Sequence, residues 1–226
     1  MKFVKMQGAG NDYVYVDCFK YKVNDPEKVA KIVSDRHFGI GADGLILVCP
    51  SDIADVRMDM YNADGSRGKM CGNGSRCVAK FAYDRAYVKK EEFELETLAG
   101  IKRISLKAEN NKAKQITVDM GSPKLYSKLP EAVIINGVQK EFIGVDMGNP
   151  HAVYFVNSLE ELESLDLEKI GPFYENHERF APDKVNSEFI YVEDSENIHM
   201  RVWERGSGET LACGTGASAS AYACIL

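Results

Sequence analysis

The sequence repeats itself after 142 residues, and this repeat limits the folds that the chain can adopt. Residues 56–74 align without a gap on residues 198–216. Apolar residues occupy the first, third and fifth positions of each copy, which predicts a half-buried strand. Each copy ends in a cysteine followed by two glycines one residue apart: Cys71-Gly72-Asn73-Gly74 and Cys213-Gly214-Thr215-Gly216. An apolar run of helical length follows, so we expect each sulfur at the start of a helix.

The repeat divides the chain into two domains, 1–120 with Cys71 and 121–226 with Cys213. Domains of about 110 residues are large enough to form a hydrophobic core of their own. Residue patterns predict helices and strands throughout. We expect helices at 26–34, 75–88, 159–170 and 217–226, strands at 3–6, 13–17, 45–49, 93–98, 101–106, 115–120, 141–147, 151–156, 188–193 and 198–204, and a connecting region at 121–137.

The stretch Gly39-Ile40-Gly41-Ala42-Asp43-Gly44 matches the glycine pattern of dinucleotide-binding loops. In such loops the glycines follow a strand and open a helix. Here they precede the apolar strand predicted at 45–49, so we reject a nucleotide site.

The composition indicates a small ligand. The formal net charge is −6 and the basic residues are scattered, which argues against nucleic acid as a partner. The chain has no run of about 18 apolar residues for a membrane span and no apolar secretory segment at its start. Its six cysteines lack the CxxC spacing of zinc sites. We therefore expect reduced thiols in a cytoplasmic protein, and a homodimer is compatible with the sequence.

The two halves differ at their ends. Three predicted strands follow the helix after Cys71, whereas the helix after Cys213 runs to Leu226 without a charged residue. A helix that is apolar all round needs cover on every side. We therefore expect that the second domain is truncated at its C-terminus and that this helix is incompletely covered.

Two thiols at helix N-termini suggest proton transfer. The helix dipole and the first N–H groups favour a thiolate there, so we expect lowered thiol pKa values and a site for a carboxylate. We expect the two sulfurs to lie near each other across a cleft, one on each face of an α-carbon. Such a site can invert an amino acid without metal or organic cofactor, and no cofactor motif is present.

Five stretches carry a resemblance to a known family: Gly8-Ala9-Gly10-Asn11-Asp12, Asn62-Ala63-Asp64-Gly65-Ser66, Met70-Cys71-Gly72-Asn73-Gly74, Gly148-Asn149-Pro150-His151 and Glu204-Arg205-Gly206-Ser207-Gly208-Glu209-Thr210-Leu211-Ala212-Cys213-Gly214-Thr215-Gly216. They are similar to the diaminopimelate epimerases over nearly the whole chain. The resemblance implies an α/β fold of two pseudo-symmetric domains, each a mixed or antiparallel sheet wrapped around a central helix. It implies a cofactor-independent enzyme that interconverts L,L- and meso-diaminopimelate in lysine and peptidoglycan-precursor biosynthesis.

The resemblance also implies residue roles. Cys71 and Cys213 correspond to the acid and base, supported by His151 and Glu204. A second group corresponds to residues that grip the reacting carboxylate end: Gly72, Asn73, Gly74, Gly214 and Thr215. A third corresponds to residues that hold the rest of the substrate: Asn11, Asn62, Asn149, Asn186, Glu204 and Arg205.

Three other functions fit some of these residues. A proline or hydroxyproline racemase would use the same chemistry, but the third group suits a longer substrate with a second amino acid head. A thiol redox protein would normally carry its cysteines in one CxxC motif. A truncated chain could also bind a carboxylate without turnover.

Overall fold

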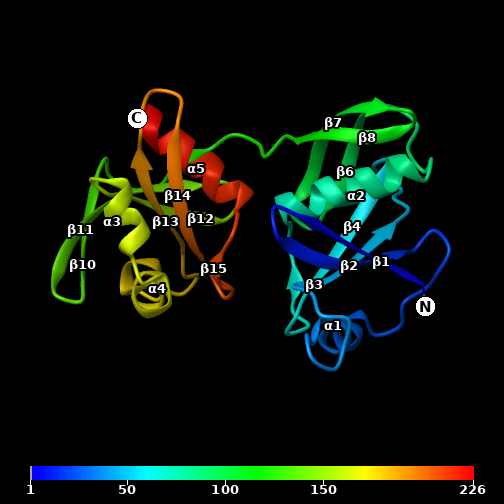
Figure 1. Ribbon diagram of the computed structural model, residues 1–226, viewed down its shortest axis with the longest axis horizontal. Helices are drawn as coiled ribbons and strands as arrows, with labels where there is room; N and C mark the ends of the chain where they lie inside the picture. Colours follow the sequence, from blue (N-terminus) through cyan, green and yellow to red (C-terminus); the bar gives the residue numbers. More distant parts are fainter. Residues whose placement is uncertain (1) are drawn as a thin grey trace. The chain divides into compact units, whose positions relative to one another are not determined.

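The structure is a computed structural model that describes residues 2–226, and it contains two compact units. Unit 1 ends at Asp119, and unit 2 is Met120–Leu226. Figure 1 shows that each unit has a curled sheet and one long helix beside it. Within the described residues, no helix has the length and apolar character needed to span a membrane.

Unit 1 is a sheet that curls around one helix. Its strands lie in the order β1-β2-β3-β4-β6-β7-β8, with β5 beside β4. The pairs β2/β3 and β4/β6 are parallel and the other pairs are antiparallel. The elements are β1 Phe3–Gly8, β2 Asn11–Asp17, α1 Pro26–Ser34, β3 Gly44–Cys49, β4 Val56–Asn62, β5 Arg67–Gly68, α2 Gly72–Asp84, β6 Glu92–Thr97, β7 Gly100–Glu109 and β8 Lys112–Val118.

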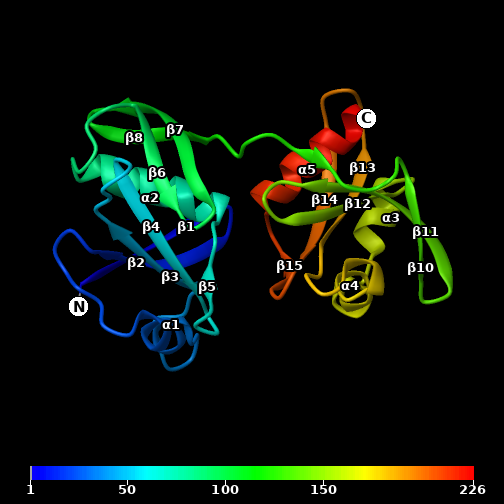
Figure 2. The same ribbon diagram turned by 180° about the vertical axis from the view of Figure 1, so that it is seen from behind.

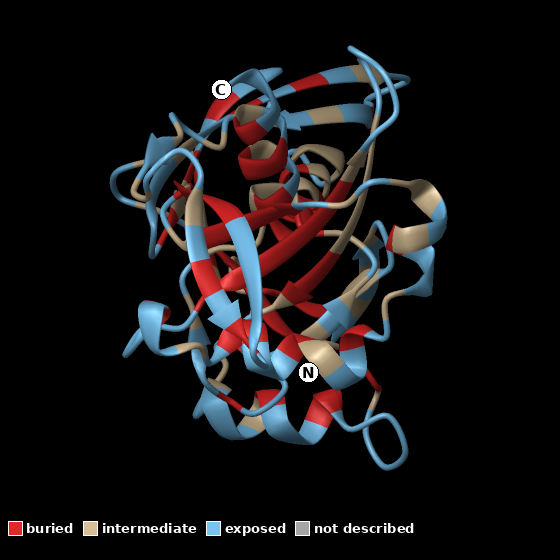
Figure 3. Ribbon diagram, turned by 90° about the vertical axis from the view of Figure 1, so that its left-hand side faces the viewer, coloured by how far each residue is buried: buried red, intermediate tan, exposed pale blue. Residues whose placement is uncertain are grey.

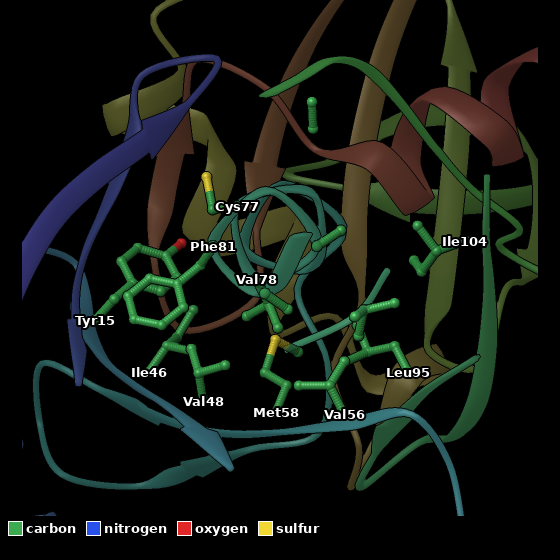
Figure 4. Close-up of a cluster of buried hydrophobic side chains, with 14 of the residues drawn as sticks. Tyr15, Ile46, Val48, Val56, Met58, Cys77, Val78, Phe81, Leu95 and Ile104 are labelled. Carbon is green, nitrogen blue, oxygen red and sulfur yellow. The ribbon is translucent and has the colours of Figure 1, made fainter. Parts of the chain in front are cut away.

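Helix α2 lies inside the curl of this sheet. Its side chains Val78 and Phe81 belong to a buried cluster with Tyr15, Ile46 and Met58 of the strands (Figure 4). The alternate residues of β2 and β3 point to the opposite face, where a second cluster packs under α1. Because both faces are covered, β3 is buried at every position, which explains its unbroken apolar sequence.

Unit 2 follows the same plan. Its strands lie in the order β10-β11-β12-β13-β14-β15, with β9 beside β11, and β12/β13 is its parallel pair. Figure 2 shows the same elements from behind. They are β9 Lys124–Leu125, β10 Glu131–Ile135, β11 Val138–Asp146, β12 Pro150–Phe155, α3 Leu159–Ser164, α4 Leu167–Glu175, the short 3-10 helix η1 Glu178–Phe180, β13 Asn186–Val192, β14 Ile198–Glu204, β15 Gly208–Thr210 and α5 Gly214–Ile225.

The sequence repeat is a repeat of backbone pairing. Leu45 of β3 pairs with Tyr61 of β4, and 142 residues later Ser187 pairs with Trp203. The next hairpin repeats as well, since Tyr61 pairs with Arg67 and Trp203 pairs with Glu209. Strand register decides which face each side chain occupies. The two cysteine motifs are therefore delivered to their helices by equivalent hairpins.

Four sequence predictions need correction. Helix α2 begins and ends three to four residues earlier than predicted. The region 121–137, predicted as a connection, contains β9 and β10. The single helix predicted at 159–170 is two helices, because Leu165 is extended and the Asp166 side chain caps a new helix by accepting the Lys169 N–H. The short strands β5 and β15 were not predicted.

Helix α5 is covered on one side, in agreement with the expectation of incomplete cover. Buried residues gather on the strands and on the inner sides of the helices (Figure 3). Ala219 and Ala223 pack in a buried cluster with residues of β11, β12 and β13. Ala217 and Ala221 on the same helix are exposed, and Ile225 is 80% exposed.

We predict that Gly171→Ala destabilises unit 2, because a methyl group there would lie 2.2 Å from Cδ2 of Trp203. Overpacking of this kind typically costs about 1–3 kcal/mol. Chemical denaturation should therefore show a lower unfolding midpoint. Lys169→Ala, an exposed change on the same helix, is the control and should change stability by less than about 0.5 kcal/mol. Equal midpoints for the two variants would contradict the packing of α4 on β14.

Candidate active site

The two repeat cysteines occupy the same position, the N-cap of the long helix in their unit. Cys71 has extended φ/ψ angles of −134° and 120°, and Cys213 has −119° and 113°. The Cys71 sulfur accepts the N–H of Gly74 at 3.3 Å, and the Cys213 sulfur accepts that of Gly216 at 3.3 Å. Each sulfur thus accepts a hydrogen bond from one of the first N–H groups of its helix, which have no acceptor within the helix.

Glycine at the third helical position lets each helix approach its sheet. A Cβ on Gly74 would lie 2.8 Å from Cδ1 of Ile46, and one on Gly216 would lie 2.6 Å from Oε1 of Glu188. Neither helix has an acidic residue in its first turn. The positive end of each dipole is therefore not neutralised by a side chain of its own helix, as an anion site requires.

In unit 1 an asparagine connects the cysteine to an acid. The Cys71 thiol donates to Oδ1 of Asn11 at 3.1 Å, and Nδ2 of Asn11 donates to Asp43 at 2.7 Å. Arg36 donates to the other carboxylate oxygen of Asp43 at 2.9 Å. Asp43 therefore fixes the direction of the Asn11 amide. It lies in the glycine-rich loop, which does precede β3.

In unit 2 Asn149 takes the place of Asn11, and it belongs to a longer series of hydrogen-bond contacts. The Cys213 sulfur lies 3.3 Å from Oγ1 of Thr215, which accepts Nδ2 of Asn149 at 3.5 Å. Oδ1 of Asn149 lies 3.1 Å from Nε2 of His151. Nδ1 of His151 lies 2.7 Å from Oε1 of Glu188, and both side chains are fully buried.

Glu204 ends β14, where its half-buried side chain accepts a hydrogen bond from Thr210. Its charge acts on the nearby thiol of Cys213. Burial raises the pKa of Glu204, and the negative charge of Glu188 adds to the rise. A carboxyl group with a raised pKa beside a thiol can exchange a proton with it.

The pKa expectation for Cys213 is wrong in direction. Burial raises its pKa to about 12, assisted by the charges of Glu204 and Glu188. The hydrogen bonds from Thr215 and from the Gly216 N–H act in the opposite direction but are outweighed. The sequence argument considered the helix end alone and could not include the two carboxylates that the sheet places next to the sulfur.

The other predicted residues divide between the two units. Asn62 donates to Ser66 in the turn after β4. Asn186 is occupied by backbone, donating to Pro150 O and accepting the Arg205 N–H. The Arg205 guanidinium donates to Asp183 O at 2.6 Å. These contacts place Asn186 as a brace between β12 and the turn that carries Arg205.

Sequence reasoning missed Asp43 and Glu188. The position of Glu188 directly before Phe189-Ile190 in a predicted strand was a usable signal, because a carboxyl group in a buried strand needs a partner. Among the described residues no three of His, Cys, Asp or Glu gather as a metal site would require. Within the described residues 2–226, all six cysteines are free thiols.

Comparison with known proteins identifies relatives over the full chain. The family model described as diaminopimelate epimerase matches residues 3–126 and 143–226. A diaminopimelate epimerase from Methanococcus maripaludis strain C5 is 48% identical over 237 residues, covering 100% of this chain and 84% of the relative. One from Acetivibrio thermocellus is 50% identical over 237 residues, covering 100% of this chain and 83% of the relative.

Solved structures confirm the α/β fold with two curled sheets. A PhzF-family phenazine biosynthesis protein from Bacillus anthracis has a TM-score of 0.71 and 18% identity, covering 99% of this chain and 80% of its own. A hydroxyproline epimerase from Agrobacterium vitis has a TM-score of 0.70 and 16% identity, covering 99% and 76%. At these identities the likeness concerns the fold.

We predict that ionisation of Glu204 lowers the free energy of unfolding as the pH rises. Its pKa is above the ordinary value of 4.5 in the folded protein, so between these two values the folded state binds more protons than the unfolded state. Stability therefore falls as the pH rises through this range. Glu204→Gln should unfold at a higher denaturant concentration than the unaltered protein at pH 7, and the difference should vanish below pH 4.5.

Exposed Glu163 provides the control, since Glu163→Gln should leave this pH dependence in place. A difference between Glu204→Gln and the unaltered protein that stays constant with pH would mean that the carboxyl group is not titrating in this range.

Proposed function

This chain belongs to the diaminopimelate epimerase family, and we propose that it interconverts L,L- and meso-diaminopimelate by moving one α-proton between the thiols of Cys71 and Cys213. The observation that carries this proposal is the matched capping geometry, with each sulfur 3.3 Å from the N–H of the third helical residue. Two equivalent thiols suit a reaction in which a proton leaves one face of a carbon and another arrives at the opposite face.

The helix ends supply the charge stabilisation that the reaction requires. Removal of an α-proton places negative charge on the substrate carboxylate, which becomes an enediolate. Preorganised N–H donors lower the cost of that charge without reorganising during the reaction. In the proposal the first turns of α2 and α5, at Gly72-Asn73-Gly74 and Gly214-Thr215-Gly216, bind the reacting carboxylate.

The raised pKa of Cys213 suits a sulfur that must remove a weakly acidic carbon-bound proton. At neutral pH the group rests as a thiol, because burial and the nearby carboxylates disfavour the thiolate. The charge of Glu204 acts on this thiol, and in the proposal Glu204 is the nearby group that accepts its proton. The thiolate then formed is a strong base, held by donors from Thr215 and Gly216.

The remaining predicted residues fit the support and recognition of the substrate. Asn11 and Asn149 hold the polar environment of the two sulfurs, and His151 supports Cys213 through Asn149. In the proposal Asn62 and Arg205 recognise the distal amino acid centre. The reaction would take place in the cytoplasm, without a cofactor, as a step in lysine and peptidoglycan-precursor biosynthesis.

The proposal predicts that either Cys71→Ala or Cys213→Ala abolishes epimerisation, because each direction needs one sulfur as base and the other as acid. A loss of at least about 10²–10⁴-fold in kcat is expected. Rates should be measured by chiral separation of the isomers. Cys224→Ala, which removes an exposed thiol of α5, is the matched control and should retain activity. Inversion at a near-normal rate by either alanine variant of Cys71 or Cys213 contradicts the two-thiol mechanism.

In heavy water, product formed early should carry solvent deuterium at the inverted carbon. The proton removed by one thiol remains on that side, and the opposite thiol delivers a proton that came from solvent. Mass spectrometry of the first product measures this. Retention of the original hydrogen would require a single base that acts on both faces.

Substrate class is tested by comparing diaminopimelate with L-proline and trans-4-hydroxy-L-proline at equal concentrations. A site with polar side chains for a second amino acid head should turn over diaminopimelate and leave the imino acids unchanged. Faster inversion of either imino acid would replace the proposed substrate and keep the thiol chemistry.

A further inference from the structure

Unit 2 carries a buried ionisable pair where unit 1 carries apolar or aromatic residues. The repeat places Glu188 at the position of Ile46, and the matching β12/β13 pairing places His151 at the position of Tyr13. Glu188, His151 and Ile46 are each 0% exposed. Buried charged pairs contribute little to stability compared with apolar residues of similar size. Because unit 1 forms the same sheet without such a pair, the fold does not require it.

The carboxyl group of Glu188 lies directly beneath the first turn of α5. A methyl group on Gly216 would lie 2.6 Å from its Oε1, so the helix backbone packs against the carboxyl group. Its Oε1 contacts Nδ1 of His151 at 2.7 Å. No hydrogen-bond partner within the described residues reaches its Oε2. The positive end of a helix and an imidazole N–H are the two neighbours that stabilise a buried carboxylate here.

In the hydrogen-bond contacts from Glu188 to Cys213, the donor and the acceptor of each contact follow from the groups at its ends. Oε1 of Glu188 and Oδ1 of Asn149 are both acceptors, so both ring nitrogens of His151 are placed to donate. The Asn149 amide then directs Nδ2 to Oγ1 of Thr215. Because that oxygen accepts, the hydroxyl hydrogen of Thr215 is available to the Cys213 sulfur at 3.3 Å.

The surroundings of Glu188 contain other titratable groups. Glu204 and Cys213 lie on the α5 side, and the negative charge of Glu188 raises the pKa of each. The charge of Glu188 also contributes to the raised pKa of Tyr126 and of Tyr154. The Tyr126 hydroxyl donates to His151 O. Within these surroundings His151 contacts the carboxylate directly and reaches the sulfur through Asn149 and Thr215.

We propose that Glu188 is a positioning residue that orients His151 and, through Asn149 and Thr215, directs a hydroxyl donor to the sulfur of Cys213. This inference rests on the proposed function only in taking Cys213 as the reacting thiol. It implies an asymmetry between the half-sites. The reactivity of Cys213 depends on Glu188, whereas the reactivity of Cys71 depends on Asp43 and Asn11.

The first test observes the ring itself. Side-chain nitrogen NMR of the full chain distinguishes a histidine that donates from both nitrogens from either neutral tautomer. The chain has four histidines, and His151→Gln identifies the signal by its loss. The nitrogen signals of His151 should show a hydrogen on Nδ1 that is bonded to a carboxylate, and Glu188→Gln should change these signals. An Nδ1 without a hydrogen in the unaltered protein overturns the proposal without any need for the variant to fold.

The second test measures the two thiols separately. Alkylation by iodoacetamide at pH 8, followed by mass spectrometry of the two peptides, gives a rate for Cys213 and one for Cys71. Loss of the negative charge of Glu188 would by itself lower the pKa of Cys213 and speed its alkylation, whereas loss of the oriented Thr215 donor slows it. The proposal therefore predicts that Glu188→Gln slows Cys213 and leaves Cys71 unchanged, and faster alkylation of Cys213 would reject it. Glu168→Gln, an exposed change on α4, should alter neither rate. Equal slowing of both thiols would indicate a general structural effect and reject the proposal.

A double-mutant cycle tests whether Glu188 acts through His151. If it does, Glu188→Gln should lower neither kcat/KM nor the rate of Cys213 alkylation any further in the presence of His151→Gln, and the direct effect of its charge on the Cys213 pKa leaves at most an acceleration. Additive losses overturn the proposal. Should the chain prove to have no epimerase activity, the NMR and alkylation results still decide the role of Glu188. If Glu188→Gln does not fold, Glu188→Asp, which shortens the side chain by one methylene, replaces it in the cycle.

Discussion

The capping of a helix by a cysteine sulfur is the interaction on which the rest of this protein depends. Cys71 and Cys213 each accept the N–H of the glycine three residues later at 3.3 Å. This contact places the sulfur at the positive end of a helix, and the glycine allows the helix to pack closely on the sheet. The equivalent hairpins that precede the cysteines place each sulfur at the same position within its own unit.

The two units have the same backbone arrangement around the cysteine but differ in the polar residues that surround its sulfur. In unit 1, Asp43 orients Asn11 directly. In unit 2, Glu188 acts on Asn149 through His151. In the proposed reaction one sulfur acts as acid and the other as base, and the two exchange these roles when the reaction runs in reverse. They would then need matched positions in their units but begin each turnover in different protonation states. A duplicated backbone with different polar partners satisfies both requirements, because register is set by hydrophobic pattern and reactivity by neighbouring charge.

Much of the fold could be predicted from the sequence, because it depends on local pattern. The alternation at 56–62 and 198–204 indicated β4 and β14, and Pro26 marked the start of α1. The errors occurred where contacts distant in sequence decide the outcome. β10 forms by pairing with β11, and the predicted helix at 159–170 breaks where Asp166 begins a new one. The raised pKa of Cys213 was missed for the same reason.

The sequence by itself determined the repeat, the two cysteine caps and the glycines that they require, because each depends on residues within a few positions of one another. Only the tertiary structure decided which acids support which sulfur. Glu188 and Cys213 are 25 residues apart in sequence, and they belong to one network because β13 passes beneath the first turn of α5. Electrostatic effects depend on distance through space and on burial, which exist once strands have paired and a helix has packed on them.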